Sequence, residues 1–222
     1  MKSITEALLY GIVDLGYINP ALLEDVTARL LEGGVDALQL RAKGSDEEEI
    51  ESYARRIIGL TESAGVPLIL NDHPELVPSM GAQGAHVGQD DFSVSDARWR
   101  AGRALAGEVP LPLIGKSTHS VAQAIDALEQ GADYIGFGPL FATPTKPGRP
   151  AIGLEDIREV HRLVNLPIFC IGGIKRENLE HVLDAGARRV VVVSAILQAA
   201  DIAGYCREVK AVLLARAATA TH

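Results

Sequence analysis

The sequence predicts an α/β fold, a single-domain (β/α)8 TIM barrel that spans residues 1–222 as one domain. Three observations favour this fold class. Strand-like apolar runs alternate with helical segments through eight units. These runs are nearly continuous in apolar residues, as a parallel sheet covered by helices requires. A weak internal repeat, in which a helix-ending glycine precedes a strand, recurs at Gly34, Gly131 and Gly186.

A doubly wound open sheet is the alternative architecture for such an alternation. That fold carries nucleotide-binding signatures, and this chain has neither a G-x-G-x-x-G segment after its first strand nor a P-loop. We therefore prefer the closed barrel, in which the carboxyl ends of all strands open onto one functional face.

The first half of the chain supplies four strand–helix units. Leucines at helical spacing predict the first helix, which ends at Gly33 and Gly34. Ser45 is predicted to cap the second helix, whose first turn is acidic. Either Ser93 or Ser95 is predicted to start the fourth. The strands are predicted at residues 7–13, 35–40, 66–70 and 85–87.

The second half repeats the pattern four more times. Helices are predicted after the fifth strand, at 154–163 and at 177–183, and Ser194 is predicted to open the last helix. The strands are predicted at residues 111–115, 132–135, 166–171 and 189–193. Polar residues follow almost every strand, so the expected functional face is strongly polar.

Composition limits the function classes. Lys and Arg total 21 against 29 Asp and Glu, so 21 − 29 gives a net charge of −8. This charge argues against nucleic-acid and anionic-membrane partners, and any anion must be bound by a local basic cluster. Cys170 and Cys206 form no CxxC pair, and no signal-like or membrane-spanning apolar run occurs. We therefore expect a cytoplasmic protein.

The loop after the sixth predicted strand has the composition of an anion-binding loop. Two glycines and two prolines in residues 136–146 shape its backbone, and Thr143, Thr145 and Lys146 are its polar tips. Hydroxyl donors and an ammonium suit an anionic ligand. The alternative is a solvated surface turn.

Two carboxylates follow neighbouring strands and predict a metal site. Asp72 follows the third strand, and Asp90 and Asp91 follow the fourth. Because adjacent strands lie about 4.8 Å apart, Asp72 and one of this pair can share a hard cation. Carboxylates without His or Cys partners favour Mg²⁺, completed by water and phosphate oxygens. The alternative is that each Asp caps a helix.

Further residues predict two phosphate subsites. Arg41, Lys43, Lys146 and Ser117 would surround a charged group on the same metal. Gly172–Gly173 and the helix start at Ser194 would bind a separate phosphate through backbone N–H groups.

At this point the chain resembles the thiamine phosphate synthase family. The resemblance covers nearly the whole chain and runs through the following segments: Gln39-Leu40-Arg41-Ala42-Lys43, Asn71-Asp72, His86-Val87-Gly88-Gln89-Asp90-Asp91, Ser117-Thr118-His119, residues 136–146, Ile171-Gly172-Gly173-Ile174 and Val193-Ser194-Ala195-Ile196.

The resemblance implies a transferase with small phosphorylated substrates. It would join an aminopyrimidine-methyl diphosphate to a thiazole monophosphate, or its carboxylated form, giving thiamine phosphate and pyrophosphate with Mg²⁺ as cofactor. Asp72 and Asp91 would bind the metal. Arg41, Lys43, Ser117 and Lys146 would hold the diphosphate and serve catalysis. Gln39 and Asn71 would contact the pyrimidine. The thiazole phosphate would be bound by Thr143, Thr145, Gly173, Val193 and Ser194.

Two positions depart from the family pattern. His73 stands where a second acid is common, and Lys116 stands in a usually apolar place before Ser117. Because side chains alternate along a strand, Lys116 should point away from Ser117, and we favour a structural role for it over a pyrophosphate contact.

Two other functions remain open. A related thiazole tautomerase would use the same barrel and phosphate site with His119 as acid and base. A tautomerase does not need the residues that bind diphosphate and metal, so retention of Arg41, Lys43, Asp72, Asp91 and Lys146 together favours the synthase. His86 is interpreted as a packed or hydrogen-bonded barrel residue. A non-catalytic sensor of phosphorylated ligands is the third possibility. The sequence leaves the oligomeric state open, a homo-oligomer included.

Overall fold

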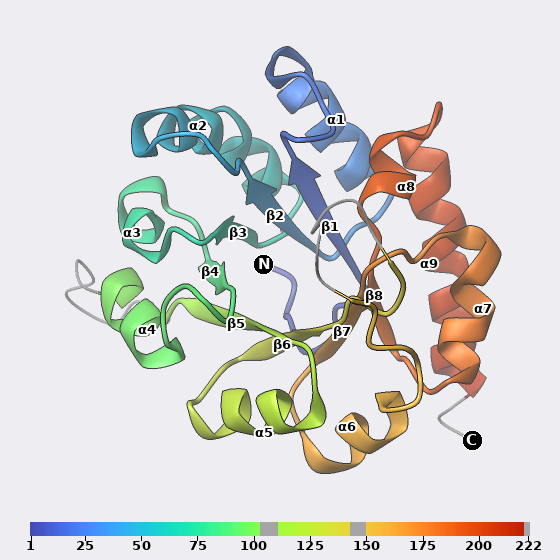
Figure 1. Cartoon of the computed structure of the whole chain (residues 1–222). Coiled ribbons are helices and arrows are strands. Elements are labelled where there is room, and N and C mark those ends of the chain that lie inside the picture. Colours follow the sequence, from blue (N-terminus) through green and yellow to red (C-terminus); the bar gives the residue numbers. More distant parts are fainter. Residues whose placement is uncertain (103–110, 143–149, 220–222) are drawn as a thin grey trace.

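The computed structural model describes residues 1–102, 111–142 and 150–219. Eight parallel strands follow one another in chain order around a closed barrel, and pairing of β8 with β1 closes the ring (Figure 1). The strands are β1 (Leu9–Asp14), β2 (Ala37–Arg41), β3 (Leu68–Asn71), β4 (Gly84–Val87), β5 (Leu113–Thr118), β6 (Tyr134–Phe137), β7 (Ile168–Ile171) and β8 (Arg189–Val191). The predicted (β/α)8 barrel is confirmed.

The helices surround this ring on its outer side (Figure 1). They are α1 (Leu23–Glu32), α2 (Glu47–Ser63), α3 (Val77–Met80), α4 (Val94–Gly102), α5 (Val121–Glu129), α6 (Ile157–Leu163), α7 (Arg176–Asp184), α8 (Ser194–Leu197) and α9 (Ile202–Thr219), with short 3-10 turns η1 (Pro20–Leu22) and η2 (Pro74–Leu76).

Two helix starts were predicted from capping residues. Asp46, not Ser45, caps α2, so that prediction is wrong. The reason is a capping box: the Glu49 amide donates to Asp46 Oδ1 at 2.9 Å, and the Asp46 amide donates to Glu49 Oε2 at 3.2 Å. For α4 the first alternative holds, since Ser93 Oγ accepts from the Asp96 amide at 3.1 Å.

Other boundaries move by a few residues. Strand β5 extends to Thr118, where it pairs with Phe137 of β6, so Ser117 lies within the strand instead of after it. Helix α6 begins at Ile157, later than predicted. Ser194 opens the four-residue helix α8 instead of the last helix, because residues 198–201 separate α8 from α9. Pairing partners and such breaks are not visible in apolar periodicity.

The core has two layers. The larger one fills the space between strands and helices, and the smaller one fills the barrel interior. Tyr10, Tyr134 and Phe169 meet edge to face inside the barrel, with ring centroids 5.3–5.8 Å apart. A Cβ at Gly115 would lie 2.1 Å from Tyr134 Cζ, so only glycine leaves room for that ring. The aromatic layer forms the floor on which a site can be built.

The N-terminal segment closes the barrel at the amino ends of the strands. Ile4 and Ala7 are buried in the inner core cluster, and the N-terminus lies in the middle of the ring of strands in Figure 1. The barrel is therefore closed at the amino ends of its strands and accessible at their carboxyl ends.

Candidate active site

A cavity opens at the carboxyl ends of the strands, above the aromatic floor. Seven of the residues predicted for substrate binding line it: Gln39, Arg41, Asn71, Ser117, Gly173, Val193 and Ser194. A second hollow adjoins it and is lined by Lys43 and Asp72, among others. Asn71 lines both hollows, so the two lie next to each other. Residues that are far apart in the sequence thus meet at one end of the barrel.

Three predicted residues, Thr143, Thr145 and Lys146, lie outside the described part of the chain. Their placement by the sequence stays a prediction.

Asp72 carries the strongest signs of a functional carboxylate. It follows β3 directly and adopts φ 63°, an uncommon conformation for a residue other than glycine. Burial raises the pKa of Asp72, and the nearby, hydrogen-bonded carboxyl group of Asp91 raises it further. Asn71 Nδ2 donates to Asp72 Oδ2 at 2.8 Å, and Lys43 Nζ lies 3.8 Å from the same oxygen. Backbone strain and a raised carboxyl pKa together are typical of functional sites.

Asp91 reaches Asp72 from the loop between β4 and α4. The Gly88 amide donates to Asp91 Oδ2 at 2.8 Å, which aims the carboxylate. Two carboxylates in contact repel each other, and a bound cation would relieve this repulsion. Paired carboxylates are the ligand type that Mg²⁺ prefers, and the magnesium site expected from the sequence stays a prediction. Among the described residues no group of three or more His, Cys, Asp or Glu could hold a metal, so other ligands would be water or phosphate oxygens.

Of the three cations predicted to bind diphosphate, Arg41 and Lys43 lie in the described part of the chain, and they differ in their surroundings. Arg41 Nη1 donates to Asp14 Oδ2 at 2.6 Å, and Asp14 is only 1% exposed. The Gly16 amide donates to the other oxygen of Asp14 at 3.0 Å. Arg41 is thus oriented by a buried partner, whereas the Lys43 side chain is 61% exposed. Asp14 was not expected at the site; the sequence feature that could have indicated it is an acidic residue at the end of an apolar strand.

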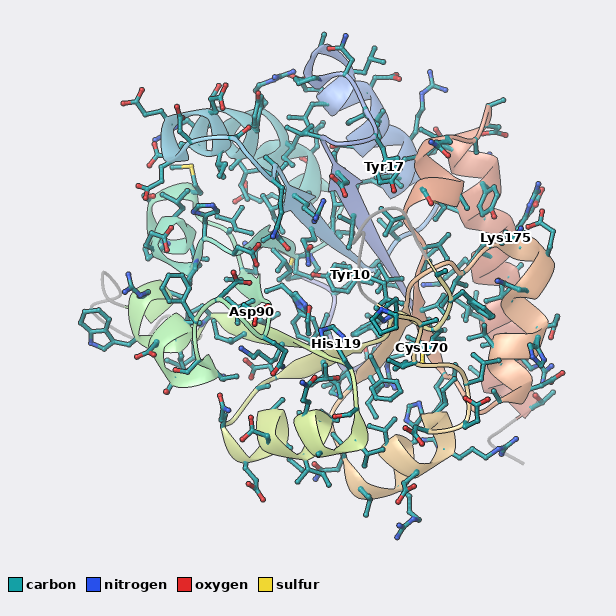
Figure 2. The ribbon with its side chains drawn as sticks, viewed as in Figure 1. Tyr10, Tyr17, Asp90, His119, Cys170 and Lys175 are labelled. Atoms are coloured by element: carbon teal, nitrogen blue, oxygen red, sulfur yellow. The ribbon has the colours of Figure 1, made fainter. Side chains whose placement is uncertain are left out.

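A chain of hydrogen bonds crosses the barrel beneath the cavity. Gln39 Nε2 donates to the Tyr10 hydroxyl at 3.1 Å, which lies 3.0 Å from the Tyr134 hydroxyl. His86 continues the chain with both ring nitrogens. Its Nδ1 lies 3.3 Å from the Tyr134 hydroxyl, and its Nε2 lies 3.0 Å from Ser117 Oγ. Figure 2 shows Tyr10 near the centre of the ring of strands.

This network uses residues that were not assigned to the site. Burial raises the pKa of both Tyr10 and Tyr134, so both phenols keep their protons. His86 is a hydrogen-bonded barrel residue, as predicted. Nothing in the sequence separates these two tyrosines from core aromatics, because each lies in an apolar strand.

The glycine pair after β7 makes the third part of the site. Gly172 and Gly173 have φ 98° and 67°, which other residues adopt only under strain. A Cβ at Gly173 would lie 2.7 Å from Phe141 Cβ, so the loop has no space for a side chain. Asn178 Nδ2 donates to the Gly173 carbonyl at 3.0 Å. Because α8 is short, phosphate binding here would depend on local N–H groups and the Ser194 hydroxyl more than on a helix dipole.

Three further polar residues were weighed in the sequence. Lys116 is 5% exposed and lines neither hollow, while Ser117 lines the cavity, so the two side chains point apart as predicted. His73 Nδ1 lies 2.8 Å from Glu75 Oε1, and this hydrogen bond raises the His73 pKa. His119 lines the cavity, and its Nδ1 donates to the Gly138 carbonyl.

No helix among the described residues is long and apolar enough to span a membrane. Both cysteines are free and buried, and burial raises the pKa of each thiol to about 12. Such thiols are unreactive core residues.

Comparisons with known proteins agree with the fold and identify the family. A profile described as thiamine monophosphate synthase matches residues 9–196. The chain is 47% identical over 178 residues to a thiamine-phosphate synthase of Thermus thermophilus, covering 80% of this chain and 82% of that one. It is 37% identical to the enzyme of the same name from Chloroflexus aurantiacus over 206 residues, covering 92% of each. The solved thiamine phosphate pyrophosphorylase of Pyrococcus furiosus superposes with a TM-score of 0.84 at 27% identity, covering 96% of this chain and 98% of that one.

Proposed function

Because the chain belongs to the thiamine monophosphate synthase family, we propose that it condenses an aminopyrimidine-methyl diphosphate with a thiazole monophosphate, or its carboxylated form, by Mg²⁺-assisted loss of pyrophosphate. The observation that carries the metal-assisted step is the interaction of Asp91 with Asp72, which lines the second hollow. In the proposed order the diphosphate leaves first, and the thiazole nitrogen then traps the pyrimidine-methyl cation; the carboxylated thiazole would in addition lose its carboxyl group as CO2. No nucleophilic side chain is needed.

Asp72 and Asp91 would hold the metal. A bound Mg²⁺ would neutralise charge on the departing diphosphate. Arg41, Lys43 and Ser117 would bind the same group, with Lys146 as the predicted fourth member. Arg41 is oriented by Asp14, and Ser117 Oγ is positioned by His86, so two of these donors are fixed before substrate binds. Fixed donors lower the barrier because they need no reorganisation as charge develops.

Gln39 and Asn71 would recognise the pyrimidine through their carbonyl oxygens. Gln39 donates its amide N–H to Tyr10, and Asn71 donates its own to Asp72. Each amide oxygen is thereby left to accept from the exocyclic amino group of an aminopyrimidine. Carbonyl dipoles aimed at the ring would also stabilise the positive charge of the cation. Recognition and catalysis would then depend on the same two amides.

The thiazole phosphate would bind at the glycine pair after β7. Gly173, Val193 and Ser194 line the cavity there, and the predicted Thr143 and Thr145 would complete the subsite. The same cavity is lined by Gln39 and Asn71, the residues proposed to contact the pyrimidine, so it would place the thiazole nitrogen against the pyrimidine. Positioning of two bound reactants is itself a large part of such catalysis.

The direct test is an assay of the purified protein with both substrates and Mg²⁺, following thiamine phosphate and pyrophosphate, with EDTA as the control. We expect both products, and we expect EDTA to abolish them. Product formation that EDTA leaves unchanged would remove the metal from the mechanism.

The thiazole tautomerase is the second candidate, because His119 lines the cavity. Thiazole isomerisation without any condensation product would favour it, and His119→Ala would then abolish turnover. Binding of the thiazole phosphate without either reaction would favour the sensor.

A further inference from the structure

The metal site proposed above depends on the loop that carries Asp91, and we propose that Lys116 is the positioning residue that fixes this loop and so aims Asp91. Lys116 lies in β5 opposite Val87, the last residue of β4. Its side chain is buried, which is rare for lysine unless its ammonium is paired. This inference rests on the proposed function.

The Lys116 ammonium joins the two ends of the loop. Its Nζ donates to the Gly88 carbonyl at 2.7 Å and to the Phe92 carbonyl at 2.8 Å. Gly88 is the first residue after β4, and Phe92 lies just beyond Asp91. One ammonium therefore closes residues 88–92 into a compact turn. Hydrogen bonds from a charged donor are the stronger class, so this closure is firm.

The closed turn determines where the Asp91 carboxylate points. The Gly88 amide donates to Asp91 Oδ2, while the Gly88 carbonyl accepts from Lys116. Both bonds are made by Gly88, whose amide and carbonyl belong to consecutive peptide groups, so holding the carbonyl limits how far the amide can move. A Cβ at Gly88 would lie 2.5 Å from Asp91 Oδ2, which shows how closely the carboxylate is seated. A second hydrogen bond joins the loop to β5, because Gln89 Nε2 donates to the Ser117 carbonyl at 2.6 Å.

Charge supports the same role. The carboxylates that face Lys116 are Asp90 and Asp91 from the loop between β4 and α4, Asp72 from the end of β3 and Asp126 from α5. Burial lowers the pKa of Lys116, and attraction to these four groups opposes that shift. A fixed positive charge beneath the Asp72–Asp91 pair reduces the cost of holding the two carboxylates together before a metal arrives.

A direct contact with pyrophosphate is the rival role for Lys116. The geometry disfavours it, because Lys116 lines neither hollow and its ammonium is engaged by two backbone carbonyls. The two roles make different predictions for a protein without substrate, since only positioning acts on the empty metal pair.

The test compares Lys116→Met, Lys116→Arg and Lys210→Met with the wild type. Methionine matches the length of lysine but removes charge and donors, whereas arginine keeps both. Lys210 is the matched control: it too is a largely buried lysine, paired with Asp36 at the other end of the barrel. Lys210→Met should therefore lose a buried ion pair but leave Mn²⁺ binding unchanged.

Two readouts separate positioning from general destabilisation. Amide hydrogen exchange of residues 88–92 in EDTA measures the order of the loop without metal. Mn²⁺ binding followed by electron paramagnetic resonance, without substrate, measures the metal pair. For Lys116→Met we expect faster exchange in the loop and Mn²⁺ affinity lower by about 10- to 100-fold, the usual effect of losing a residue that orients a metal ligand. Lys116→Arg should show loop exchange and Mn²⁺ affinity between those of Lys116→Met and the wild type. If Lys116→Met does not fold, Lys116→Arg is compared with the wild type instead.

The outcomes are distinct. Unchanged exchange or unchanged Mn²⁺ affinity in Lys116→Met would overturn the positioning role. Weaker binding of inorganic pyrophosphate with intact Mn²⁺ affinity would overturn it in favour of direct contact. An equal loss of Mn²⁺ affinity in Lys210→Met would show that the effect is general destabilisation and would also overturn it. Failure of the wild type to bind Mn²⁺ would instead contradict the metal site itself.

Discussion

The two ends of the barrel each hold a largely buried aspartate, and the two aspartates have opposite surroundings. Asp36, at the amino end of β2, accepts from the Leu8 and Leu9 amides at 2.9 and 3.1 Å and pairs with Lys210. Burial alone would raise the pKa of Asp36, but these partners lower it overall. The charge of Asp36 is therefore fully matched by its partners.

Asp72, at the carboxyl end of β3, faces another carboxylate. Its pKa is raised by burial and by Asp91, and its backbone is in the left-handed region. The favourable partners, Asn71 and Lys43, only partly offset this. The contrast indicates that the amino end of the barrel is organised for stability, whereas the carboxyl end retains unfavourable charge where a ligand is expected.

The greatest loss of activity should follow removal of one carboxylate of the pair at the carboxyl end. Asp91→Ala should lower Mg²⁺-dependent turnover by about 100- to 1000-fold, because the departing diphosphate loses its charge neutralisation. Asp91 is exposed, so the circular dichroism spectrum should not change. Steady-state assays over a Mg²⁺ series measure the loss. Wild-type turnover in this variant would refute the metal assignment.

The next effect belongs to the amino end. Asp36→Ala should lower the free energy of unfolding by about 3 kcal/mol, because it leaves Lys210 and two amides without their acceptor. Urea denaturation measures this. The control is Asp25→Ala, which removes an exposed ion pair with Arg29 and should change stability little. The activity per folded molecule of Asp36→Ala should equal that of the wild type. A lower value would contradict the inference that the amino end serves stability alone.

A weaker effect of opposite sign is expected at Asp72. Asp72→Asn, measured in EDTA, should raise the free energy of unfolding by about 1 kcal/mol, because it removes the repulsion from Asp91 after allowance for screening by water. Asparagine tolerates the left-handed backbone, so the strain is unchanged. Added Mg²⁺ should stabilise the wild type and shrink this advantage. A destabilised Asp72→Asn protein would contradict the comparison.

The subtlest effect is a difference in pH dependence between the two aspartates. The folded pKa of Asp36 lies below its ordinary 3.8, so its contribution is present above that pH and is lost as the pH falls through the folded value. The folded pKa of Asp72 lies above 3.8, so the wild type loses stability as the pH rises through it. In EDTA, the advantage of Asp72→Asn should therefore grow above pH 3.8, and the deficit of Asp36→Ala should fade below it. Denaturation at a series of pH values tests both slopes.

Local sequence patterns were enough to establish the barrel and most members of the site. Apolar strands alternating with helices imply a parallel sheet, and in a barrel the carboxyl ends of the strands converge on one face. Gln39, Asn71 and Ser117, within their strands, and Asp72, directly after β3, could therefore be placed at that face in advance. Such patterns suffice because strand period and capping chemistry depend on neighbours in the chain. Even so, Asp46 displaced Ser45 as a cap through its partner three residues on.

What each site residue faces could be known only from the folded chain. That Arg41 meets Asp14, that Tyr10 links Gln39 to Tyr134, and that Lys116 holds the loop of Asp91 all depend on contacts between different strands. The pKa of Asp72 likewise depends on Asp91, which lies 19 residues away (91 − 72). Register and side-chain direction in a closed barrel set such pairs, and both follow from packing over the whole ring, which no local pattern encodes.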